Sequence, residues 1–478
     1  MSQIRIPDAS GQRGLVLAAA CLCQLMVVLD ISVVNVALPS IATNLHFATG
    51  TLSWVVNAYT LVFGGLLLLG GRIADFIGHR VAMFAGLGLF GVASLAGGLA
   101  QTPAELIAAR AGQGLAAAVL APLSLTVIMV GFPEGPARTR ALTAWSTVAG
   151  AGSALGVLMG GLLTQWLSWR WVLLVNIPIV IAVVILAAVS IRDTRTHRRP
   201  RLDMTGAALI TLALVSLVNG AVRADAGWGS RWVLGSFAVA AVAGAAFVVW
   251  EGRAAEPLVR FGMLRSRPVA VANIVSLLQG SLMTSGFYFA SLFLQDLLGF
   301  NPLAAGAAFL PFCVGMIAGA ALSGRLVSRL GPRTVIATGL GLAAIGMFLF
   351  GQMDAHSTFL DGFMGPSIIA SIGLGLCIVA NTTLATTGIA PQEAGLASGL
   401  VNTSRQIGGS IGLAALATVA TSATGGHGPR LSSAGYDAAF LVAAAFAVAA
   451  AIVVAVFAPT RAAATGAAPV SAKQHEPA

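Results

Sequence analysis

Fourteen long apolar runs divide this chain of 478 residues, and they restrict its fold more than any other feature. Each run holds about 20 mostly apolar residues, the length that an α-helix needs to cross the hydrocarbon core of a membrane. The runs cover 14–39, 51–71, 81–100, 104–131, 139–166, 171–191, 204–222, 232–252, 268–294, 303–327, 334–353, 362–389, 395–421 and 437–458. We therefore predict an all-α polytopic membrane protein with fourteen spanning helices.

Charged residues are scarce enough to exclude a large soluble enzyme. They make up 9% of the chain, whereas soluble domains carry about 25%. The net charge of +10 would suggest a nucleic-acid partner in a soluble protein, but in a membrane protein it marks loops on the inner side. The only lysine is Lys473, so the chain has no Gly-Lys-Ser/Thr phosphate loop. We expect no nucleic-acid partner and no use of ATP.

The positions of the basic residues predict the orientation in the membrane. If the N-terminus lies inside and the runs alternate, inner segments hold twenty of the 26 Lys and Arg residues and outer segments hold four. The other two, Arg110 and Arg405, fall within spans. Because inner loops of membrane proteins are enriched in Lys and Arg, we expect both termini in the cytoplasm and a multi-pass protein of the cytoplasmic (inner) membrane.

Two sequence echoes indicate an internal duplication. Residues 71–80 (GRIADFIGHR) and 324–333 (GRLVSRLGPR) are identical at four of ten positions, at an offset of 253 residues. Residues 152–156 (GSALG) and 408–412 (GGSIG) repeat at an offset of 256. Parallel halves with the substrate site between them are a known transporter plan. We expect a tail at 1–13, a six-helix bundle at 14–191, a linker with two spans at 192–262, a second six-helix bundle at 263–458 and a disordered cytoplasmic tail at 459–478.

Five motifs together resemble one known family. They are 29–39 (LDISVVNVALP), 71–80, 106–114 (LIAARAGQG), 152–161 with its spaced glycines, and 169–178 with Trp-Arg-Trp and Asn-Ile-Pro. The chain resembles the major facilitator superfamily, and within it the 14-span drug:proton antiporters of the EmrB/QacA type. It departs from the family pattern at Phe76 and His79, where arginine is common, and at Val157, where the helix 5 motif has proline.

Asp30 is the only acidic residue deep within a run, and Arg110 is the basic residue that matches it. A charged Asp at a helix centre costs about 2.5–3.5 kcal/mol on insertion scales. Because a nearby cation favours the charged form of a carboxyl group, moving the pair together or apart can switch its affinity for a proton. We expect Asp30 and Arg110 to couple transport to protons, as the resemblance also implies. The alternatives are a neutral, hydrogen-bonded Asp30 and a static ion pair.

Two groups of residues are expected to control movement between the halves. In the first loop motif we expect an inner gate formed by Gly71, Arg72, Asp75, Gly78 and Arg80, with Asp75 accepting hydrogen bonds from helix N-termini or nearby arginines. In the helix 5 motif, glycines at spacing four share one face and let helices approach closely. We expect that face, formed by Gly152, Gly156 and Gly160, where the two halves meet, and Gly161 belongs to the same motif.

Polar residues on apolar runs are the candidates for the substrate cavity, and we expect about half of them to face it. They are Asn35, Asn57, Tyr59, Gln113, Asn273, Gln279, Tyr288, Asn381, Asn402 and Arg405. Because no acidic residue remains for a dication once Asp30 couples protons, we expect neutral, zwitterionic or monocationic hydrophobic substrates. Two enzyme-like patterns, GxGxxG at 86–91 and GxSxG at 408–412, lie within runs without the strand-to-helix turn that they require.

These observations predict a transporter and not an enzyme. We expect efflux of hydrophobic drugs or antibiotics in exchange for protons, by alternating access and with resistance as the outcome. The alternative is an exporter of an endogenous metabolite, lipid precursor or siderophore. The expected partners are a small hydrophobic substrate and the lipid bilayer, and we expect a monomer with no metal and no cofactor apart from the coupling protons.

Overall fold

The computed structural model describes residues 10–48, 51–133, 135–190, 203–223, 228–254, 257–353, 357–389, 394–424 and 431–459. Most of the two predicted tails lies outside these residues. Within them the chain is helical, without strands, and fourteen segments are long and apolar enough to cross a membrane. The predicted all-α fold and the number of spans are therefore confirmed.

The helices follow one another with short connections. They are α1 (Ser10–Leu45), α2 (Trp54–Ile77), α3 (His79–Leu99), α4 (Pro103–Gly131), α5 (Pro136–Trp166), α6 (Trp171–Leu174), α7 (Asn176–Ser190), α8 (Met204–Val222), α9 (Arg231–Glu251), α10 (Phe261–Leu264), α11 (Arg267–Leu292), α12 (Pro302–Ala308), α13 (Leu310–Leu330), α14 (Pro332–Phe350), α15 (Gly365–Thr386), α16 (Ala394–Thr424) and α17 (Ser433–Phe457). Two π-helical turns, η2 (Phe293–Leu297) and η3 (Phe359–Met364), adjoin α11 and α15.

Side-chain caps fix the starts of several helices. The hydroxyl of Thr102 accepts from the backbone N–H of Glu105 at the start of α4, and Asp203 and Asn301 cap α8 and α12 in the same way. The Glu105 carboxylate reaches back to the N–H of Gln101 at 2.7 Å. The Thr102 hydroxyl thus satisfies one backbone donor in the first turn of α4, and the Glu105 carboxylate binds the N–H of Gln101, which precedes the cap.

The two copies of the loop motif make the same turn. Gly78, between α2 and α3, has φ 93° and ψ 142°, and Gly331, between α13 and α14, has φ 82° and ψ 158°. Positive φ is accessible to glycine without the steric cost that a side chain adds. The repeated glycine therefore has a local reason, which is the tight reversal between two spanning helices.

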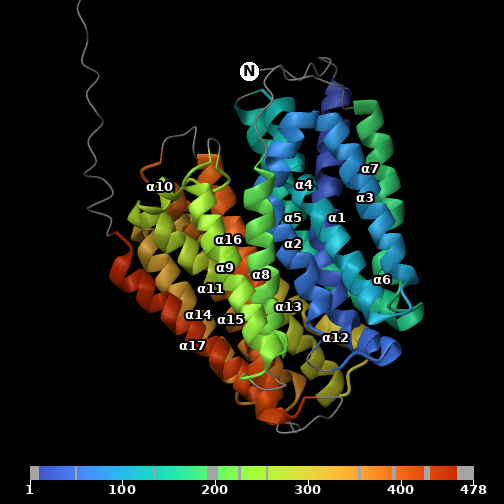
Figure 1. Cartoon of the computed structure of the whole chain (residues 1–478), viewed down its shortest axis with the longest axis vertical. Helices are drawn as coiled ribbons and strands as arrows, with labels where there is room; N and C mark the ends of the chain where they lie inside the picture. Colours follow the sequence, from blue (N-terminus) through green and yellow to red (C-terminus); the bar gives the residue numbers. More distant parts are fainter. Residues whose placement is uncertain are drawn as a thin grey trace, which may run out of the picture.

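Helix pairing is also repeated. In α1–α7, here called the N-terminal bundle, the main contacts join α1 to α5, α2 to α4, and α3 to both α4 and α7. In α11–α17, the C-terminal bundle, the corresponding contacts join α11 to α16, α13 to α15, and α14 to both α15 and α17. Figure 1 shows the two bundles side by side, with ribbons that diverge toward the end of the molecule where α1 begins.

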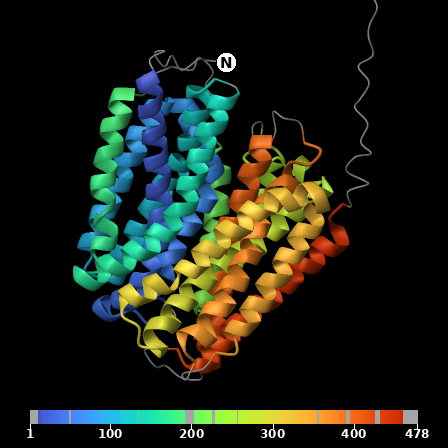
Figure 2. The ribbon, with the colours of Figure 1, turned by 180° about the vertical axis from the view of Figure 1, so that it is seen from behind.

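We call the side where α1 begins the proximal side and the side where α1 ends the distal side. On the distal side, α12 of the C-terminal bundle packs against α5 of the N-terminal bundle, as the reverse view in Figure 2 shows. The largest group of buried apolar residues lies here and includes Leu38, Phe293 and Leu413 from both bundles. The two bundles are therefore in close apolar contact at the distal side.

The two additional helices, α8 and α9, attach to one edge of the junction between the bundles (Figure 1). Leu214 and Val218 of α8 pack with Leu61 of α2 and Ala414 of α16. The hydroxyl of Thr418 in α16 also donates to the carbonyl of Ala221 at 2.6 Å. Helix α8 therefore contacts both bundles, whereas the main contact of α9 is with α8.

Candidate functional site

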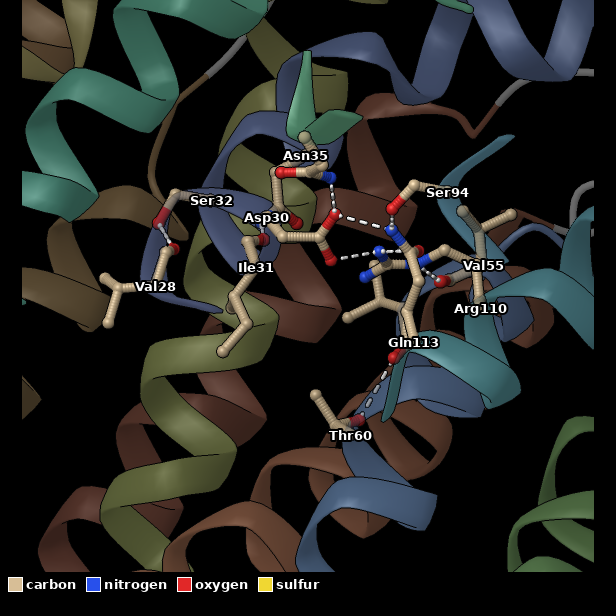
Figure 3. A network of polar contacts seen from close by, with 12 residues as sticks. Val28, Asp30, Ile31, Ser32, Asn35, Val55, Thr60, Ser94, Arg110 and Gln113 are labelled. Atoms are coloured by element: carbon tan, nitrogen blue, oxygen red, sulfur yellow. Dashed lines mark hydrogen bonds and ion pairs between the residues drawn. The ribbon is translucent and has the colours of Figure 1, made fainter. Parts of the chain in front are cut away.

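A carboxylate is fully buried near the middle of α1. Asp30 has 0% exposure, and its Oδ2 accepts from Nη1 of Arg110 at 2.5 Å. Its Oδ1 accepts from Nε2 of Gln113 at 2.9 Å (Figure 3) and from Nδ2 of Asn176 at 2.7 Å. Helices α1, α4 and α7 supply these groups. Because all three partners donate hydrogen to the carboxyl group, the arrangement fits the ionised form of Asp30.

Arg110 is held by more than its acidic partner. It is 1% exposed, its Nε donates to the carbonyl of Val55 at 3.0 Å, and its Nη1 also donates to Oε1 of Gln113 at 2.8 Å. The guanidinium lies over the ring of Tyr59, 4.5 Å from its centroid. Removing one partner of a buried ion pair typically costs about 3–5 kcal/mol, because the other charge is left uncompensated. The structure thus brings together the two charges that the sequence singled out.

One further side chain, Ser94, completes the Asp30 network, which we define as Asp30, Arg110, Gln113, Asn176 and Ser94. The amide of Gln113 donates to the hydroxyl of Ser94 in α3 at 2.9 Å (Figure 3). Sequence reasoning did not identify Ser94 or Asn176 as partners of Asp30. Asn176 did carry a signal, because it belongs to the Asn-Ile-Pro motif, but its distance from Asp30 depends on how α7 packs against α1.

The helix 5 glycines are the first correction to the sequence analysis. We expected Gly152, Gly156 and Gly160 where the two halves meet, but they face α1 of their own bundle. A Cβ atom on Gly156 would lie 2.8 Å from Cβ of Ser32, and one on Gly160 would lie 2.5 Å from the carbonyl oxygen of Val33. These contacts place the α5 backbone against the turns of α1 that hold Asp30.

The contact with the other bundle comes from the adjacent face of α5. A Cβ atom on Gly161 would lie 2.5 Å from the carbonyl oxygen of Pro302, and one on Gly306 would lie 2.7 Å from the carbonyl of Val157. Val157 is the position where the family motif has proline. The repeat behaves as the first copy does, since Gly408 and Gly412 of α16 pack against α11 of their own bundle.

Hydrogen bonds join the two bundles in the distal half of the molecule. The hydroxyl of Ser291 in α11 donates to the carbonyl of Asn35 at 2.7 Å, and the amide of Gln295 donates to the carbonyl of Val36 at 2.9 Å. The hydroxyls of Thr60 in α2 and Ser410 in α16 lie 2.5 Å apart. The same α1 helix therefore carries both the buried Asp30 and carbonyl groups that bind the opposite bundle.

The predicted substrate-cavity residues are the second correction. We expected about half to face a cavity, but eight of the ten are buried, and only two are partly exposed. Gln113 and Tyr59 belong to the surroundings of Arg110, and Tyr288 stacks edge-on against Phe289. The amide of Asn35 donates to the carbonyl of Ile31 within α1, at 2.9 Å.

Three of the buried candidates connect helices of the C-terminal bundle. Asn273 accepts from the hydroxyl of Ser404 at 2.7 Å, and Asn381 donates to the hydroxyl of Ser276 at 2.7 Å. Gln279 donates to the carbonyl of Leu374 at 3.1 Å. These residues fix α11 to α15 and α16, although the side-chain oxygen of Asn381 has no hydrogen-bond partner among the described residues.

Three candidates remain outside these structural connections. Asn57 is fully buried, and neither atom of its side-chain amide has a hydrogen-bond partner in the part of the chain that the structure describes. Asn402 and Arg405, both in α16, are half-buried and bond to each other at 2.6 Å. Asn402 and Arg405 are therefore the two of the ten predicted residues whose side chains are partly exposed.

The inner-gate motif lies at the proximal side, around the turn between α2 and α3. Arg72 donates to the carbonyl of Pro257, in the segment that follows α9. Arg80 lies 5.6 Å from the ring centroid of Phe84 in α3. A Cβ atom on Gly71 would lie 3.9 Å from Cβ of Pro122 in α4. The side chain of Asp75 lies outside the described residues, so its expected contacts stay a prediction.

Comparisons with known proteins agree with this architecture. A model of the Major Facilitator Superfamily matches residues 20–413. The chain is 44% identical to the cephamycin export protein CmcT of Amycolatopsis lactamdurans, over 90% of this chain and 89% of that protein. It is 39% identical to the puromycin resistance protein pur8 of Streptomyces alboniger, over 88% of this chain and 84% of that protein.

A solved structure shares the fold. It is a bacterial homolog to the human lysosomal transporter Spinster, in an inward-facing and occupied conformation. The TM-score is 0.70 at 16% sequence identity, and the match covers 95% of this chain and 99% of that one. The arrangement of two paired bundles is therefore that of known membrane transporters.

Proposed function

The chain belongs to the Major Facilitator Superfamily, and from that premise we propose that it exports hydrophobic drugs or antibiotics across the cytoplasmic membrane in exchange for protons, without acting as an enzyme. The similarity to a cephamycin export protein, CmcT, and to a puromycin resistance protein, pur8, supports this class of substrate. The near-complete coverage of both relatives supports carrying the activity over to the whole chain.

The proximal side is the cytoplasmic side in this proposal, because the predicted inner segments hold most of the basic residues. Both termini then lie in the cytoplasm. The contacts between the bundles support a state that is closed toward the outside, since Ser291, Gln295 and α12 all join the bundles on the distal side. A substrate would enter this state from the cytoplasm or the inner leaflet.

The observation that carries the coupling mechanism is the position of Asp30 on α1. Its carboxylate accepts three hydrogen bonds, so a proton can bind Oδ2 only when Arg110 withdraws from that oxygen. Five and six residues further along the same helix, the carbonyls of Asn35 and Val36 bind the opposite bundle. A shift of α1 that accompanies protonation would therefore act directly on the distal contacts.

The transport cycle follows from this linkage. With the distal side closed, Asp30 is ionised and paired with Arg110, and the substrate binds. When the distal side opens, a proton from outside replaces Arg110 at Oδ2 and the substrate leaves. Return to the distal-closed state releases the proton to the cytoplasm. The protonmotive force drives the cycle because Asp30 takes up its proton on one side and loses it on the other.

Everted membrane vesicles test this proposal. A proton gradient is imposed, a candidate drug is added, and the collapse of the gradient is recorded for wild type, Asp30→Asn and the matched control Asp296→Asn. Asp296 lies in η2, outside the Asp30 network. We expect drug-dependent collapse with wild type and the control, and none with Asp30→Asn. Equal collapse with Asp30→Asn would remove Asp30 from proton coupling.

A further inference from the structure

A second cation at membrane depth, the half-buried Arg405, lies in the C-terminal bundle, and it has no acidic partner among the described residues. Arg405 follows the start of α16 at Ala394 by eleven residues, or about 16 Å at 1.5 Å per residue. Its one hydrogen bond within the described chain runs from Nη2 to Oδ1 of Asn402 at 2.6 Å. Arg110, by contrast, is neutralised by Asp30. The two arginines at membrane depth thus differ in whether the protein supplies their negative charge.

The direction of Arg405 follows from the neighbours of α16. Gly408 and Gly412 face α11, whereas Ser410 and the neighbouring Gln406 face α2 of the N-terminal bundle. At 100° per residue, Arg405 and Asn402 project between these two faces, toward the region between the bundles. About two and three turns beyond Arg405 along the same face, Leu413 and Leu416 belong to the apolar cluster that closes the distal side.

The partial exposure of Arg405 and Asn402 also supports their placement toward the region between the bundles. Arg405 and Asn402 are the two partly exposed residues among the ten polar candidates, so solvent or a ligand can reach them. Guanidinium carries five N–H donors and no acceptor, and only one contact from Arg405 is made within the described residues. The side-chain NH2 of Asn402, whose oxygen accepts from Arg405, donates to no group in the described part of the chain either.

Among the side chains that the structure describes, no carboxylate is available to Arg405 at this depth. Asp30 is enclosed within the N-terminal bundle by its own donors. The other acidic side chains that the structure describes lie at or near helix ends, and they are Glu105, Asp203, Glu251, Asp296 and, one turn into α17, Asp437. The described side chains therefore leave the negative charge that pairs with Arg405 to a bound molecule.

We propose that Arg405 and Asn402 form an anion subsite that binds the carboxylate of an amphiphilic substrate in the central region between the bundles. This inference rests on the proposed export function and narrows its substrate class. A carboxylate matches the planar fork of a guanidinium with two parallel hydrogen bonds, and the Asn402 amide can donate to one of the same oxygens. The preferred substrates then carry a carboxylate, as anions or zwitterions, and purely cationic amphiphiles are disfavoured.

Binding to the purified full-length protein in phosphatidylcholine nanodiscs tests the subsite. The probes are two carboxylate amphiphiles with different bodies, benzylpenicillin and cholate, each beside its uncharged methyl ester. The variants are Arg405→Gln, Arg405→Lys and the control Arg223→Gln. Arg223 is a matched control because it also bonds to an asparagine one turn away, Asn219, but lies exposed at the end of α8.

We expect at least one carboxylate to bind wild type more tightly than its ester. Arg405→Gln should weaken carboxylate binding roughly tenfold or more, since a charge-assisted contact is lost, and should leave ester binding unchanged. Arg405→Lys should retain part of the affinity, because it keeps the charge but not the fork. Arg223→Gln should behave as wild type. Both esters binding as tightly as their acids, or equal losses for acid and ester in Arg405→Gln, would overturn the subsite.

Two further arms separate the alternatives. If phosphatidylglycerol in the nanodiscs abolishes carboxylate binding to wild type, the site belongs to a lipid headgroup and the substrate assignment is wrong. Proton-driven transport of the methyl esters and of a cationic dye is measured in proteoliposomes. If these compounds are transported and no probe shows a preference for the carboxylate, the subsite is rejected and the export function is retained. If binding depends on Arg405 but no probe is transported, the export function is rejected and the subsite is retained.

Discussion

Adjacent glycines in α5 offer a direct test of alternating access. Gly160 and Gly161 differ by one position, but a methyl group on Gly160 would press on the Val33 carbonyl of the same bundle, whereas one on Gly161 would press on the Pro302 carbonyl of the other bundle. In each case the built Cβ atom lies 2.5 Å from a backbone oxygen. Backbone cannot rotate away as a flexible side chain can, so one helix must move.

The expected size of the effect follows from this overlap. Forcing an additional methyl group into a well-packed site typically costs about 1–3 kcal/mol. For Gly160→Ala the cost falls on any state in which α1 and α5 stay packed, so it lowers the stability of the fold. For Gly161→Ala it falls only on the distal-closed state, and a differential of this size shifts the two-state ratio roughly 5–150-fold toward the distal-open state.

Distance measurements between nitroxide labels can separate the two effects. The four cysteines are replaced by serine, and labels are attached through Leu167→Cys at the distal end of α5 and Leu360→Cys in η3, both of which are exposed. We expect Gly161→Ala to add a longer distance between the labels at nearly unchanged Tm. Gly160→Ala should lower Tm without a new distance.

A third variant sets the baseline, because Gly88→Ala in α3 places its methyl group in open space and should change neither quantity. If Gly161→Ala leaves the distance distribution of the parent unchanged, the distal contact between α5 and α12 does not open during the cycle. Alternating access would then not depend on separation of α5 from α12.

Three other substitutions are informative. Thr60→Val leaves the buried hydroxyl of Ser410 without its inter-bundle partner, which destabilises the distal-closed state by about 1–3 kcal/mol. We expect this variant to add a longer distance between the same two labels, and an unchanged distance would contradict the prediction. Asp203→Ala removes the α8 cap and the acceptor for the Trp250 indole. The free energy of unfolding should decrease by about 0.5–2 kcal/mol, and Tm should fall with it. Asp203→Asn should retain the cap and most of that stability. Asp75→Asn should impair drug export in a resistance assay at normal membrane expression, and full activity would remove Asp75 from the gate.

The spans and the central ion pair could be predicted because few residues are eligible. Hydropathy alone identifies fourteen helices, since the bilayer leaves no other way to satisfy the backbone of an apolar run. The pairing of Asp30 with Arg110 is an elimination argument, because Asp30 is the only acid at membrane depth. Because so few charged residues lie within the spans, the partner of Asp30 can be predicted without knowing how the helices pack.

The rest depends on helix rotation, which spacing does not reveal. Gly160 and Gly161 differ by 100° around α5, and that angle decides whether a residue faces α1 or the opposite bundle. The same ambiguity explains why most polar candidates are buried between helices of one bundle, as Asn381 is against Ser276. Backbone acceptors such as the Val55 carbonyl carry no signature in the sequence at all.

The internal duplication gives the transporter two junctions between its bundles, one along α2 and α16 and the other along α5 with α12 and α13. A strictly twofold molecule would offer the surrounding lipid two equivalent lateral entrances. Helix α8 removes that equivalence, because it covers the α2–α16 junction with Leu214 and Val218, and α9 lies outside it. The two sides of the protein are therefore not equivalent for an amphiphile that diffuses in the inner leaflet. We expect the amphiphile to enter from the α5 side, which α8 does not cover.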